Sequence, residues 1–408
     1  MSEEGNVLEM SSAPEAIEFR HLRAFVAVAE DLNFSRAADR LFISQPALSR
    51  QIRALERLIG CALFRRSTQR VELTLSGEAL LAQARPLLAD LADAITTARS
   101  VGGELAGRTV RLWKPWMDAS VGITDLEANR AAVEDLHSRF APPEGVSVVP
   151  IVAGGVPALR VAPRDPTTGK TVLFVHGGGH ISGSAYGYRH FAGAIAAASH
   201  ASVLAVDYRL APEHPFPASL DDTLSAYTWL LDTGVRADAL TVVGDSSGGG
   251  LVLSLLLGLR ERGLPLPAGA ALMCPWLDLS GRTQSGPAGG AHAPSVAMAR
   301  HFAALYLAGH PAGDPLVDPL NADLRGLPPL LVQTASGEFT RQEAQLLAKR
   351  ARAQGVDVTA TVYPVEAHDF PIFWTFLPDA ATALTELAHF VHSVTCGEHP
   401  QTGAREAK

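Results

Sequence analysis

Hydrophobic residues between positions 20 and 60 recur at intervals of three and four, which is the period of an amphipathic helix. Polar residues suited to helix caps interrupt this pattern twice. Ser35 is expected to cap a second helix, and Ser44 a third helix that has Pro46 in its first turn. The pattern therefore predicts three short helices joined by tight turns.

The third predicted helix has two different faces. Leu48, Ile52 and Leu55 lie on one side, as expected of residues that pack into a core. The other side carries amide, hydroxyl and guanidinium groups, which can reach base edges and phosphates in a DNA major groove. The segment LFRRSTQRVELT follows, and its first two arginines precede a turn and a short alternating strand, as in a wing. The candidate DNA contacts are Ser44, Gln45, Ser49, Arg50, Arg53, Arg65 and Arg66.

Charge is distributed unevenly along the chain. Residues 20–72 hold ten arginines and five acidic residues, so they carry a net charge of +5 within a chain of 408 residues whose total is −8. A basic segment on an otherwise acidic chain favours a phosphate-facing surface near the N-terminus. A solvated charged face is the alternative when charge is considered alone.

The stretch LRAFVAVAEDLNFSRAADRLFISQPALSRQIRALERLIGCALFRR, with VELTLSGEALL after it, resembles the winged helix-turn-helix of LysR-type transcription regulators. The similarity extends without a gap over residues 19–88, and nothing after residue 105 resembles the rest of such a regulator. It implies binding to double-stranded DNA and a homodimer formed through a linker helix. Three helices that pack without binding DNA are the alternative.

Apolar residues recur at spacings of three and four in the predicted linker helix, as in a seam between two packed helices. Pro86 departs from the pattern, because proline lacks a backbone donor and clashes with the preceding turn. The same seam could instead pack on the domain that follows. Its residues are Leu81, Ala84, Leu88, Leu91 and Ile95.

Beyond residue 143, short β-branched or apolar runs alternate with helical patterns. Runs that are apolar on both faces and joined by helices indicate a mostly parallel sheet with helices on each side. The predicted strands lie in VSVVPIV, TVLFVHGG, SVLAVDYR, LTVVGDSS, AGAALMCPW, LLVQTAS and VTATVYPV. The fold class is therefore α/β, preceded by an all-α winged helix-turn-helix domain and its linker helix.

The fourth of these runs ends in GDSSG, which has the G-x-S-x-G spacing of a nucleophile elbow. Gly244 and Gly248 flank the serine, because a sharp strand-to-helix turn leaves no room for a Cβ atom at these positions. Ser246, which follows Asp245, occupies the centre of the motif and is favoured over Ser247 as the nucleophile. A chance match in a glycine-rich chain is the alternative.

An earlier apolar run ends in His176, Gly177, Gly178 and Gly179. Glycines there let backbone N–H groups approach the oxygen that becomes negative when a carbonyl is attacked. His180 completes an apparent His-x-x-x-His pair. Three glycines between the two imidazoles disfavour the helix that would align them, so no metal is expected.

The HGGG and GDSSGG segments, with DYRLAPEHPFPA between them and CPWLDLSG and GLPPLLVQ after them, resemble the hormone-sensitive-lipase family of α/β hydrolases. The similarity covers residues 146–370. It implies a helical cap over the sheet and hydrolysis of short-to-medium acyl esters with no metal or organic cofactor. An aromatic residue is common in the family where His180 stands.

The same resemblance implies a Ser-acid-His triad in that chain order. Ser246 is the expected nucleophile, and His368 in VEAHDF is the expected general base. Glu338 in TASGEF stands at the position of the acid, where family members often have aspartate. The alternative acids are Glu343, Asp357 and Asp369, and the expected oxyanion hole consists of backbone N–H groups of Gly178, Gly179 and Ser247.

The predicted organisation follows from these motifs. It comprises a flexible acidic N-terminus (1–18), the winged helix-turn-helix (19–76), a linker or dimerisation helix (77–104), a linker with an N-terminal cap segment (105–142), the hydrolase (143–396) and a flexible tail (397–408). Residues 113–142 and 283–309 are expected to form the cap.

The N-terminus lacks the basic start and apolar core of a secretory signal, so a cytoplasmic protein without a membrane anchor is expected. The three scattered cysteines are expected to be unpaired thiols.

Two functions compete at this point. One is an active esterase joined to a DNA-binding head, and the other is a regulator whose hydrolase domain binds an inducer without significant turnover. A head left over from gene fusion, with no DNA target, is a third possibility. Because the chain has a candidate for every catalytic role, the sequence favours an active esterase.

Overall fold

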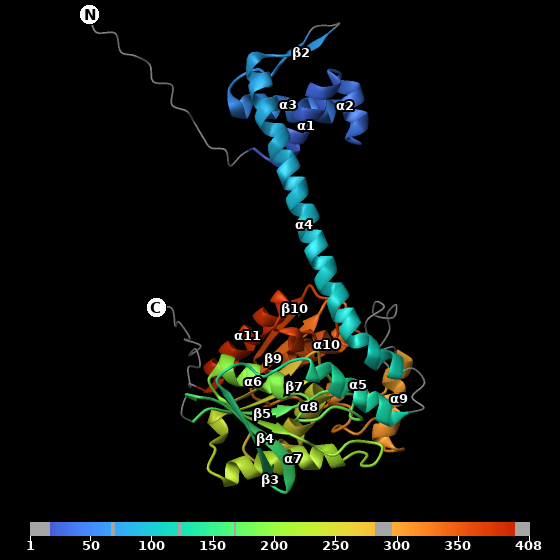
Figure 1. The fold of residues 1–408 in the computed structure, drawn as a ribbon, viewed down its shortest axis with the longest axis vertical. Helices are drawn as coiled ribbons and strands as arrows, with labels where there is room; N and C mark the ends of the chain where they lie inside the picture. Colours follow the sequence, from blue (N-terminus) through green and yellow to red (C-terminus); the bar gives the residue numbers. More distant parts are fainter. Residues whose placement is uncertain (1–16, 67–69, 121–124, 167–168, 282–295, 396–408) are drawn as a thin grey trace, which may run out of the picture. The chain divides into compact units, whose positions relative to one another are not determined.

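The computed structural model describes residues 17–66, 70–120, 125–166, 169–281 and 296–395 (Figure 1). For residues 89–90, 92–102 and 296 it describes the backbone only. The chain divides into two compact units, Met1–Gly103 and Glu104–Lys408. The expected flexible ends, apart from residues 17 and 18, and residues 283–295 of the expected cap lie outside the description.

The first unit begins with three helices and a two-stranded hairpin. Helix α1 covers Phe19–Asp31, α2 covers Phe34–Arg40 and α3 covers Gln45–Ile59. Strands β1 (Phe64–Arg66) and β2 (Val71–Leu73) pair antiparallel after α3. The three helices and the wing that the sequence predicts are therefore present.

The core of the first unit is formed by the apolar face of α3. Leu48, Ile52 and Leu55 are fully buried, and they belong to one cluster with Phe25 and Val28 of α1. Burial of an aliphatic or aromatic side chain of this size contributes about 1.5–3 kcal/mol. The hydrophobic period of the sequence thus identifies the buried face of this helix.

The helix caps agree with the sequence at α3 and differ at α2. Ser44 caps α3, because its Oγ accepts a hydrogen bond from the Ala47 N–H at 3.4 Å. The expectation that Ser35 caps α2 is wrong. Asn33 occupies the cap, and its Oδ1 accepts hydrogen bonds from the N–H groups of Ser35 and Arg36. Asparagine and serine both suit a helix cap, and in this chain α2 begins directly after the asparagine.

Helix α4 is continuous over Leu75–Ser120, and the boundary between the two units falls within it. Its helical residues include Pro86, so the proline does not end the helix. Leu81 and Ala84 pack in the core of the first unit. The side chain of Ile95 lies outside the description, and the dimer seam stays a prediction.

The second unit is built on an eight-stranded sheet with the order β10-β9-β8-β7-β5-β6-β4-β3. Its strands are β3 (Val146–Ala153), β4 (Val156–Pro163), β5 (Thr171–Val175), β6 (Ser202–Val206), β7 (Leu240–Asp245), β8 (Gly269–Met273), β9 (Leu330–Ala335) and β10 (Val358–Tyr363). Strand β4 pairs antiparallel with β3 and β6, and every other pair in this sheet is parallel. The mostly parallel α/β sheet predicted from the sequence is confirmed.

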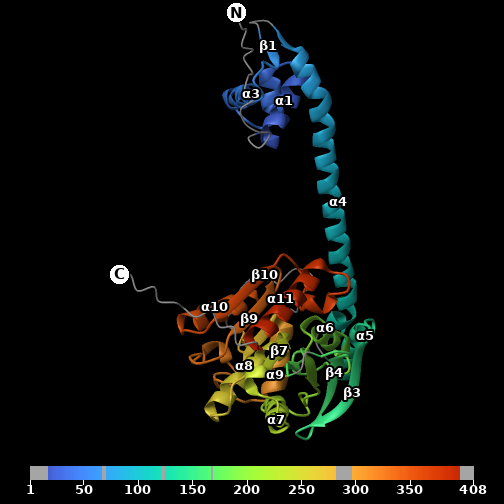
Figure 2. The ribbon, with the colours of Figure 1, turned by 90° about the vertical axis from the view of Figure 1, so that its left-hand side faces the viewer.

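Strand β4 was absent from the predicted strands. It pairs with β3 along the whole length of both strands, and the two lie at one edge of the sheet (Figure 2). The turn between them contains Gly154 and Gly155, both with positive φ. A Gly-Gly pair between two extended runs is a hairpin signal. Pro157 and Pro163 weaken the strand pattern of β4, because proline within a run argues against a strand unless the strand is at an edge.

Helices cover both faces of this sheet. They are α5 (Leu126–Ser138), α6 (Arg189–Ser199), α7 (Ala218–Asp232), α8 (Ser246–Glu261), α9 (Val296–Leu307), α10 (Arg341–Ala353) and α11 (Pro378–Thr395). Val172 and Phe174 of β5 share a cluster with residues of α6 and α11, whereas Leu173 and Val175 share another with α7, α8 and α10. Because neighbouring residues of β5 face two cores, Val172–Val175 of this strand are all apolar and buried.

No helix within the described ranges combines the length and the hydropathy that crossing a bilayer requires. Cys61 and Cys274 are free thiols, and Cys274 is buried. Cys396 lies outside the described residues.

We expect Ile52→Ala to destabilise the first unit by about 2–5 kcal/mol, because it leaves a cavity where a fully buried side chain packs. Leu58→Ala on the same helix should cost much less, because Leu58 is 37% exposed. Proteolysis of the full chain at increasing temperature, read from cleavage within α3, measures both losses. Equal losses would contradict the assignment of the buried face.

Candidate active site

A sharp turn joins β7 to α8 at Ser246, whose φ of 49° lies in the left-handed region. Strain of this kind at a non-glycine residue costs about 1–3 kcal/mol and clusters at functional sites. A Cβ atom on Gly244 would come within 2.5 Å of the Gly248 carbonyl oxygen, and one on Gly248 would strike the Val175 carbonyl oxygen. Both positions that flank the turn therefore require glycine.

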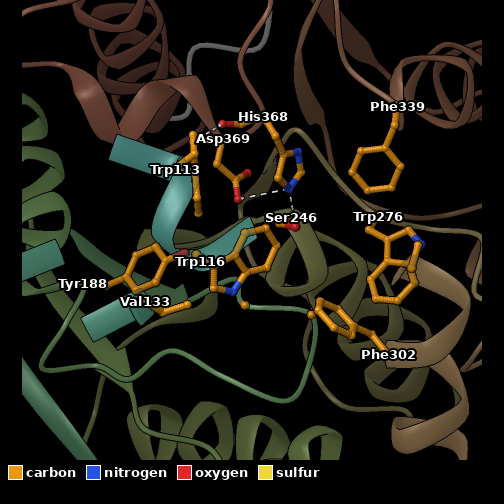
Figure 3. Close-up of a pocket in the computed structure, with 13 residues that line it drawn as sticks. Trp113, Trp116, Val133, Tyr188, Ser246, Trp276, Phe302, Phe339, His368 and Asp369 are labelled. Atoms are coloured by element: carbon orange, nitrogen blue, oxygen red, sulfur yellow. Dashed lines mark hydrogen bonds and ion pairs between the residues drawn. The ribbon is translucent and has the colours of Figure 1, made fainter. Parts of the chain in front are cut away.

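The hydroxyl at this turn meets an imidazole (Figure 3). Ser246 Oγ lies 2.8 Å from His368 Nε2, although 122 positions separate the two residues. The other ring nitrogen, Nδ1, forms a hydrogen bond and ion pair with Glu338 Oε1. Ser246 follows β7, Glu338 follows β9 and His368 follows β10. Parallel strands end at one edge of the sheet, and this edge brings the three side chains together.

The other acids considered from the sequence lie elsewhere. Glu343 Oε2 accepts hydrogen bonds from the backbone N–H groups of Leu277 and Asp278, so this carboxylate fixes the loop after β8. Asp357 is exposed. Asp369 is buried and contacts the imidazole, but its Oδ2 lies 3.3 Å from His368 Nε2, the nitrogen that faces the serine. Glu338 is the carboxylate at Nδ1.

The glycine-rich loop after β5 lies against the same turn. The Gly177 N–H donates to Asp245 Oδ1 at 3.0 Å, and the His180 N–H donates to Ser247 Oγ at 3.3 Å. Gly178 and Gly179 have φ values of 115° and 66°, which favour glycine. Both line the pocket that contains Ser246.

Ser247 is the second residue of α8. The N–H groups in the first turn of a helix have no acceptor within the helix, and the helix dipole makes this end attractive to negative charge. The Ser247 side chain is fully buried, and its backbone N–H belongs to this turn. The end of the helix therefore supplies a donor beside the Ser246 hydroxyl.

The two histidines of the His-x-x-x-His pair have different ring partners. The His176 ring stacks on Tyr208 with centroids 4.2 Å apart, and the His180 ring stacks on Tyr306 with centroids 3.8 Å apart. Burial lowers the pKa of His180 to about 3, so its ring is neutral and packs as an aromatic side chain. Within the described residues, no group of three or more His, Cys, Asp or Glu side chains is placed to hold a metal ion.

Aromatic side chains form much of the wall of the pocket around Ser246 (Figure 3). The pocket has a volume of about 450 Å³, including its open mouth. Trp113 and Trp116 come from the last turns of α4, Phe302 from α9, Trp276 from the loop after β8, and Phe339 from the loop after β9. The expected cap ranges contain the first three of these residues. Sequence reasoning did not identify any of the five individually, because an aromatic residue at helical spacing indicates a core as readily as a pocket.

Trp113 also holds the backbone beside the imidazole. Its Nε1–H donates to the His368 carbonyl oxygen at 3.1 Å, and its ring packs edge-on against Phe373 with centroids 6.2 Å apart. Trp113 is 5% exposed. The last turns of α4 are therefore part of the framework that positions His368.

Helix α5 fixes the far end of the glycine-rich loop. The Arg130 guanidinium donates to the carbonyl oxygens of Ile181 and Ala211, and it forms a two-pronged ion pair with Glu213 at 2.7 Å. Because Ile181 lies two residues after Gly179, helix α5 restrains the end of the glycine-rich loop.

Three buried carboxyl groups surround His368. Burial lowers the pKa of His368, but the charges of Asp369 and Glu338 outweigh burial and raise this pKa to about 9. Burial raises the pKa of Asp245 to about 7 and the pKa of Asp369 well above its ordinary value. Interacting groups of this kind lose their protons as a set.

The candidate DNA contacts lie on α3 and β1 of the first unit. Gln45, Arg50 and Arg53 are exposed on α3, as is Ser44 at its N-terminus, and Ser49 is half-buried. Arg53 Nε donates to the Ser49 carbonyl oxygen at 3.2 Å. The five residues thus share one helix and its cap.

The two arginines of β1 differ from each other. Arg65 is exposed. Arg66 forms an ion pair with Glu56 at 2.8 Å, and its guanidinium lies 4.8 Å from the centroid of the Phe34 ring. Arg66 is therefore engaged within the first unit, which a sequence pattern does not reveal.

Comparisons with known proteins match both units. Residues 172–372 match a family model described as alpha/beta hydrolase fold, and residues 19–78 match the model for bacterial regulatory helix-turn-helix proteins of the lysR family. An acetyl-hydrolase of Streptomyces hygroscopicus is 37% identical over 277 residues, which are 66% of this chain and 91% of that protein. An esterase of Acinetobacter venetianus is 32% identical over 270 residues, which are 65% of this chain and 89% of that protein.

Solved structures give the same result. An esterase from the bacterial hormone-sensitive lipase family is similar with a TM-score of 0.65 at 34% identity, over 69% of this chain and 98% of that one. A protein named EstE5, from a crystal soaked by p-nitrophenyl butyrate, is similar with a TM-score of 0.66 at 34% identity, over 71% of this chain and 98% of that one. Both resemblances inferred from the sequence are confirmed.

We expect the free energy of unfolding of the second unit to fall between pH 7 and pH 5, in part through His180. Its pKa in the folded chain, about 3, lies below the ordinary 6.5, so the unfolded chain binds the proton first and acid favours unfolding. This residue alone should contribute a loss of about 2 kcal/mol over that interval.

His180→Phe separates this contribution from the others, because it keeps a flat ring against Tyr306 and removes the titrating group. Its stability should fall less than that of the wild type over the same interval. Urea unfolding followed by tryptophan fluorescence at both pH values measures the difference. Equal losses in the two proteins would show that His180 does not stay neutral in the fold.

Proposed function

Because the chain belongs to the α/β-hydrolase family that includes bacterial hormone-sensitive-lipase-type esterases, and carries a LysR-type helix-turn-helix, we propose that it is a serine carboxylesterase joined to a DNA-binding head. The observation that supports the esterase most is the 2.8 Å contact between Ser246 Oγ and His368 Nε2. A serine hydroxyl is a weak nucleophile unless an adjacent base removes its proton.

In the proposed reaction, His368 accepts the proton of Ser246 as its oxygen attacks the ester carbonyl. Glu338 at Nδ1 holds the imidazole in the correct tautomer and stabilises the imidazolium that forms. His368 then gives the proton to the leaving alcohol. Water then attacks the acyl-enzyme as His368 accepts one of its protons. The bond between the acyl carbon and Ser246 Oγ breaks, the acid leaves, and His368 returns the proton to Ser246 Oγ.

The negative oxygen of the tetrahedral intermediate would be met by backbone N–H groups of Gly178, Gly179 and Ser247. Preorganised donors of this kind contribute about 3–4 kcal/mol each to lowering the barrier. The positive φ angles of the two glycines and the first turn of α8 support this assignment. No metal or organic cofactor is required.

The substrate class follows from the pocket walls. Trp116, Trp276 and Phe302 offer apolar surface to an acyl chain beside the Ser246 hydroxyl. The Phe302 ring packs against Gly179, where a Cβ atom would meet it, so this ring closes the pocket beside the oxyanion loop. We infer short-to-medium acyl esters as substrates.

The head is proposed to bind double-stranded DNA through α3 in the major groove. Exposed amide and guanidinium groups on this helix can bond base edges and phosphates. A cytoplasmic homodimer is part of this proposal, because two-fold DNA sites are read by two-fold proteins. An esterase that binds or consumes its own inducer would link the two activities.

A regulator that binds an ester-like inducer without turnover is the second candidate. The raised pKa of His368, about 9, favours it, because an imidazolium cannot accept the proton of Ser246. The presence of every catalytic candidate in one contact network favours the esterase.

Ser246→Ala should lower kcat/KM for p-nitrophenyl butyrate by about 10⁴-fold or more, because it removes the nucleophile. Ser254→Ala is the matched control, because this buried serine lies on the same helix and its Oγ donates to the Gly250 carbonyl oxygen. It should retain activity near that of the wild type. Initial rates of p-nitrophenol release measure both. Wild-type hydrolysis that does not depend on Ser246 would exclude the esterase and leave the non-catalytic regulator.

Arg50→Ala and Arg53→Ala should each weaken binding to duplex DNA, by about 1–3 kcal/mol for a base contact. If the lost contact was to a phosphate, the slope of log binding constant against log salt concentration should become shallower by about one. The probe is a duplex that the wild-type chain selects from a random-sequence pool. Arg20→Ala is the control, because Arg20 pairs with Glu18 at 2.6 Å. Unchanged affinity in both α3 variants would refute the proposed face, and failure to select any duplex would refute DNA binding.

A further inference from the structure

Asp369 occupies a place that the proposed triad does not use. It follows His368 directly, its side chain is 3% exposed, and its Oδ2 lies 3.3 Å from His368 Nε2 (Figure 3). The same nitrogen faces Ser246 Oγ at 2.8 Å. Glu338 engages the opposite ring nitrogen, so the imidazole lies between two carboxyl groups.

The backbone fixes this second carboxyl group in place. Asp369 has a φ of 48°, in the left-handed region that disfavours most residues other than glycine, asparagine and aspartate. The turn η4 (Phe370–Phe373) follows it, and its residues are fully buried. The Trp113 indole holds the preceding carbonyl oxygen. Asp369 is therefore held against Nε2 by its surroundings.

We propose that Asp369 shares a proton with His368 at Nε2 and thereby sets the lower pH limit of the esterase. This inference rests on the proposed function. Asp369 acts through His368 and is a positioning residue: it decides when Nε2 is free to accept the proton of Ser246.

In the resting state before substrate attack, one proton lies between His368 Nε2 and Asp369 Oδ2. Whether it resides on the imidazole or on the carboxyl group, the Nε2 lone pair is engaged. When the proton leaves to solvent water, His368 becomes a neutral base and Asp369 a carboxylate. Nε2 then takes the proton of Ser246, and the new positive charge lies beside Asp369, which stabilises it until the proton passes to the leaving alcohol.

The neighbouring groups favour such a shared proton. Asp245 at the end of β7 and Glu338 after β9 add negative charge, and Cys274 after β8 and Tyr188 before α6 are titratable groups on other elements near this pair. Burial and these like charges disfavour a bare carboxylate at Asp369, and its pKa is raised accordingly. Asp369 and Glu338 in turn raise the pKa of His368 to about 9.

Asp369→Asn tests the proposal in the full chain, because asparagine has the same shape and tolerates the left-handed backbone. The acid limb of kcat/KM against pH for p-nitrophenyl butyrate should move to lower pH by about one unit or more. Glu366→Gln is the control. It removes one negative charge two positions before His368, but the residue is exposed, and the limb should not move. Asp369→Gly, which suits the positive φ, should give the same shift if asparagine disturbs the fold.

A second measurement does not depend on turnover. The protein is Ser246→Ala labelled at histidine, and the NMR signal of the His368 ring is assigned by its loss in His368→Gln. When Asp369→Asn is added, this signal should titrate at lower pH. An acid limb and a His368 titration that both stay at the wild-type pH would overturn the inference. Absence of Ser246-dependent hydrolysis in the wild type would instead overturn the proposed function, and the titration would still decide the role of Asp369.

Discussion

The crowded turn at Ser246 is the constraint on which the rest of the second unit depends. The chain must pass from β7 into α8 with Ser246 at positive φ, and the start of α8 must approach the carbonyl oxygens of Val175 and His176 without a side chain between them. This close approach fixes α8 against β5, and the Gly177 N–H bonded to Asp245 fixes the glycine-rich loop. These two contacts place the Ser246 hydroxyl beside the glycine-rich loop.

Most of the fold could be predicted because its signals are local. Seven of the eight strands of the large sheet lie in short β-branched or apolar runs, and α3 shows its buried face by spacing alone. The failures are also local. Strand β4 contains two prolines and lies near the edge, and α2 is capped by Asn33, although Ser35 suits the same role. In each case two permitted conformations compete, and contacts with the rest of the chain select one.

The site was less predictable than the fold, for a physical reason. Ser246, Glu338 and His368 could be nominated because each stands in a motif at the end of a strand. The contact of Asp369 with Nε2 depends on one backbone angle, and that of Trp113 with the His368 carbonyl oxygen joins positions 255 apart. Arg66 is a further example: its charge predicts a DNA contact, which stays a prediction, whereas its contacts with Glu56 and Phe34 are visible only in the fold.

The last turns of helix α4 belong to the second unit, so this unit begins well before the first strand of its sheet. The matched hydrolase family model starts at residue 172 and the sheet at Val146, yet Trp113 and Trp116 are pocket walls. A shortened chain that began where the sheet begins would lose the indole rings that pack on Phe302 and Phe373, together with the hydrogen bond to the His368 carbonyl oxygen. Separating the two halves of this polypeptide by cleavage requires a cut inside a helix, upstream of the tryptophans.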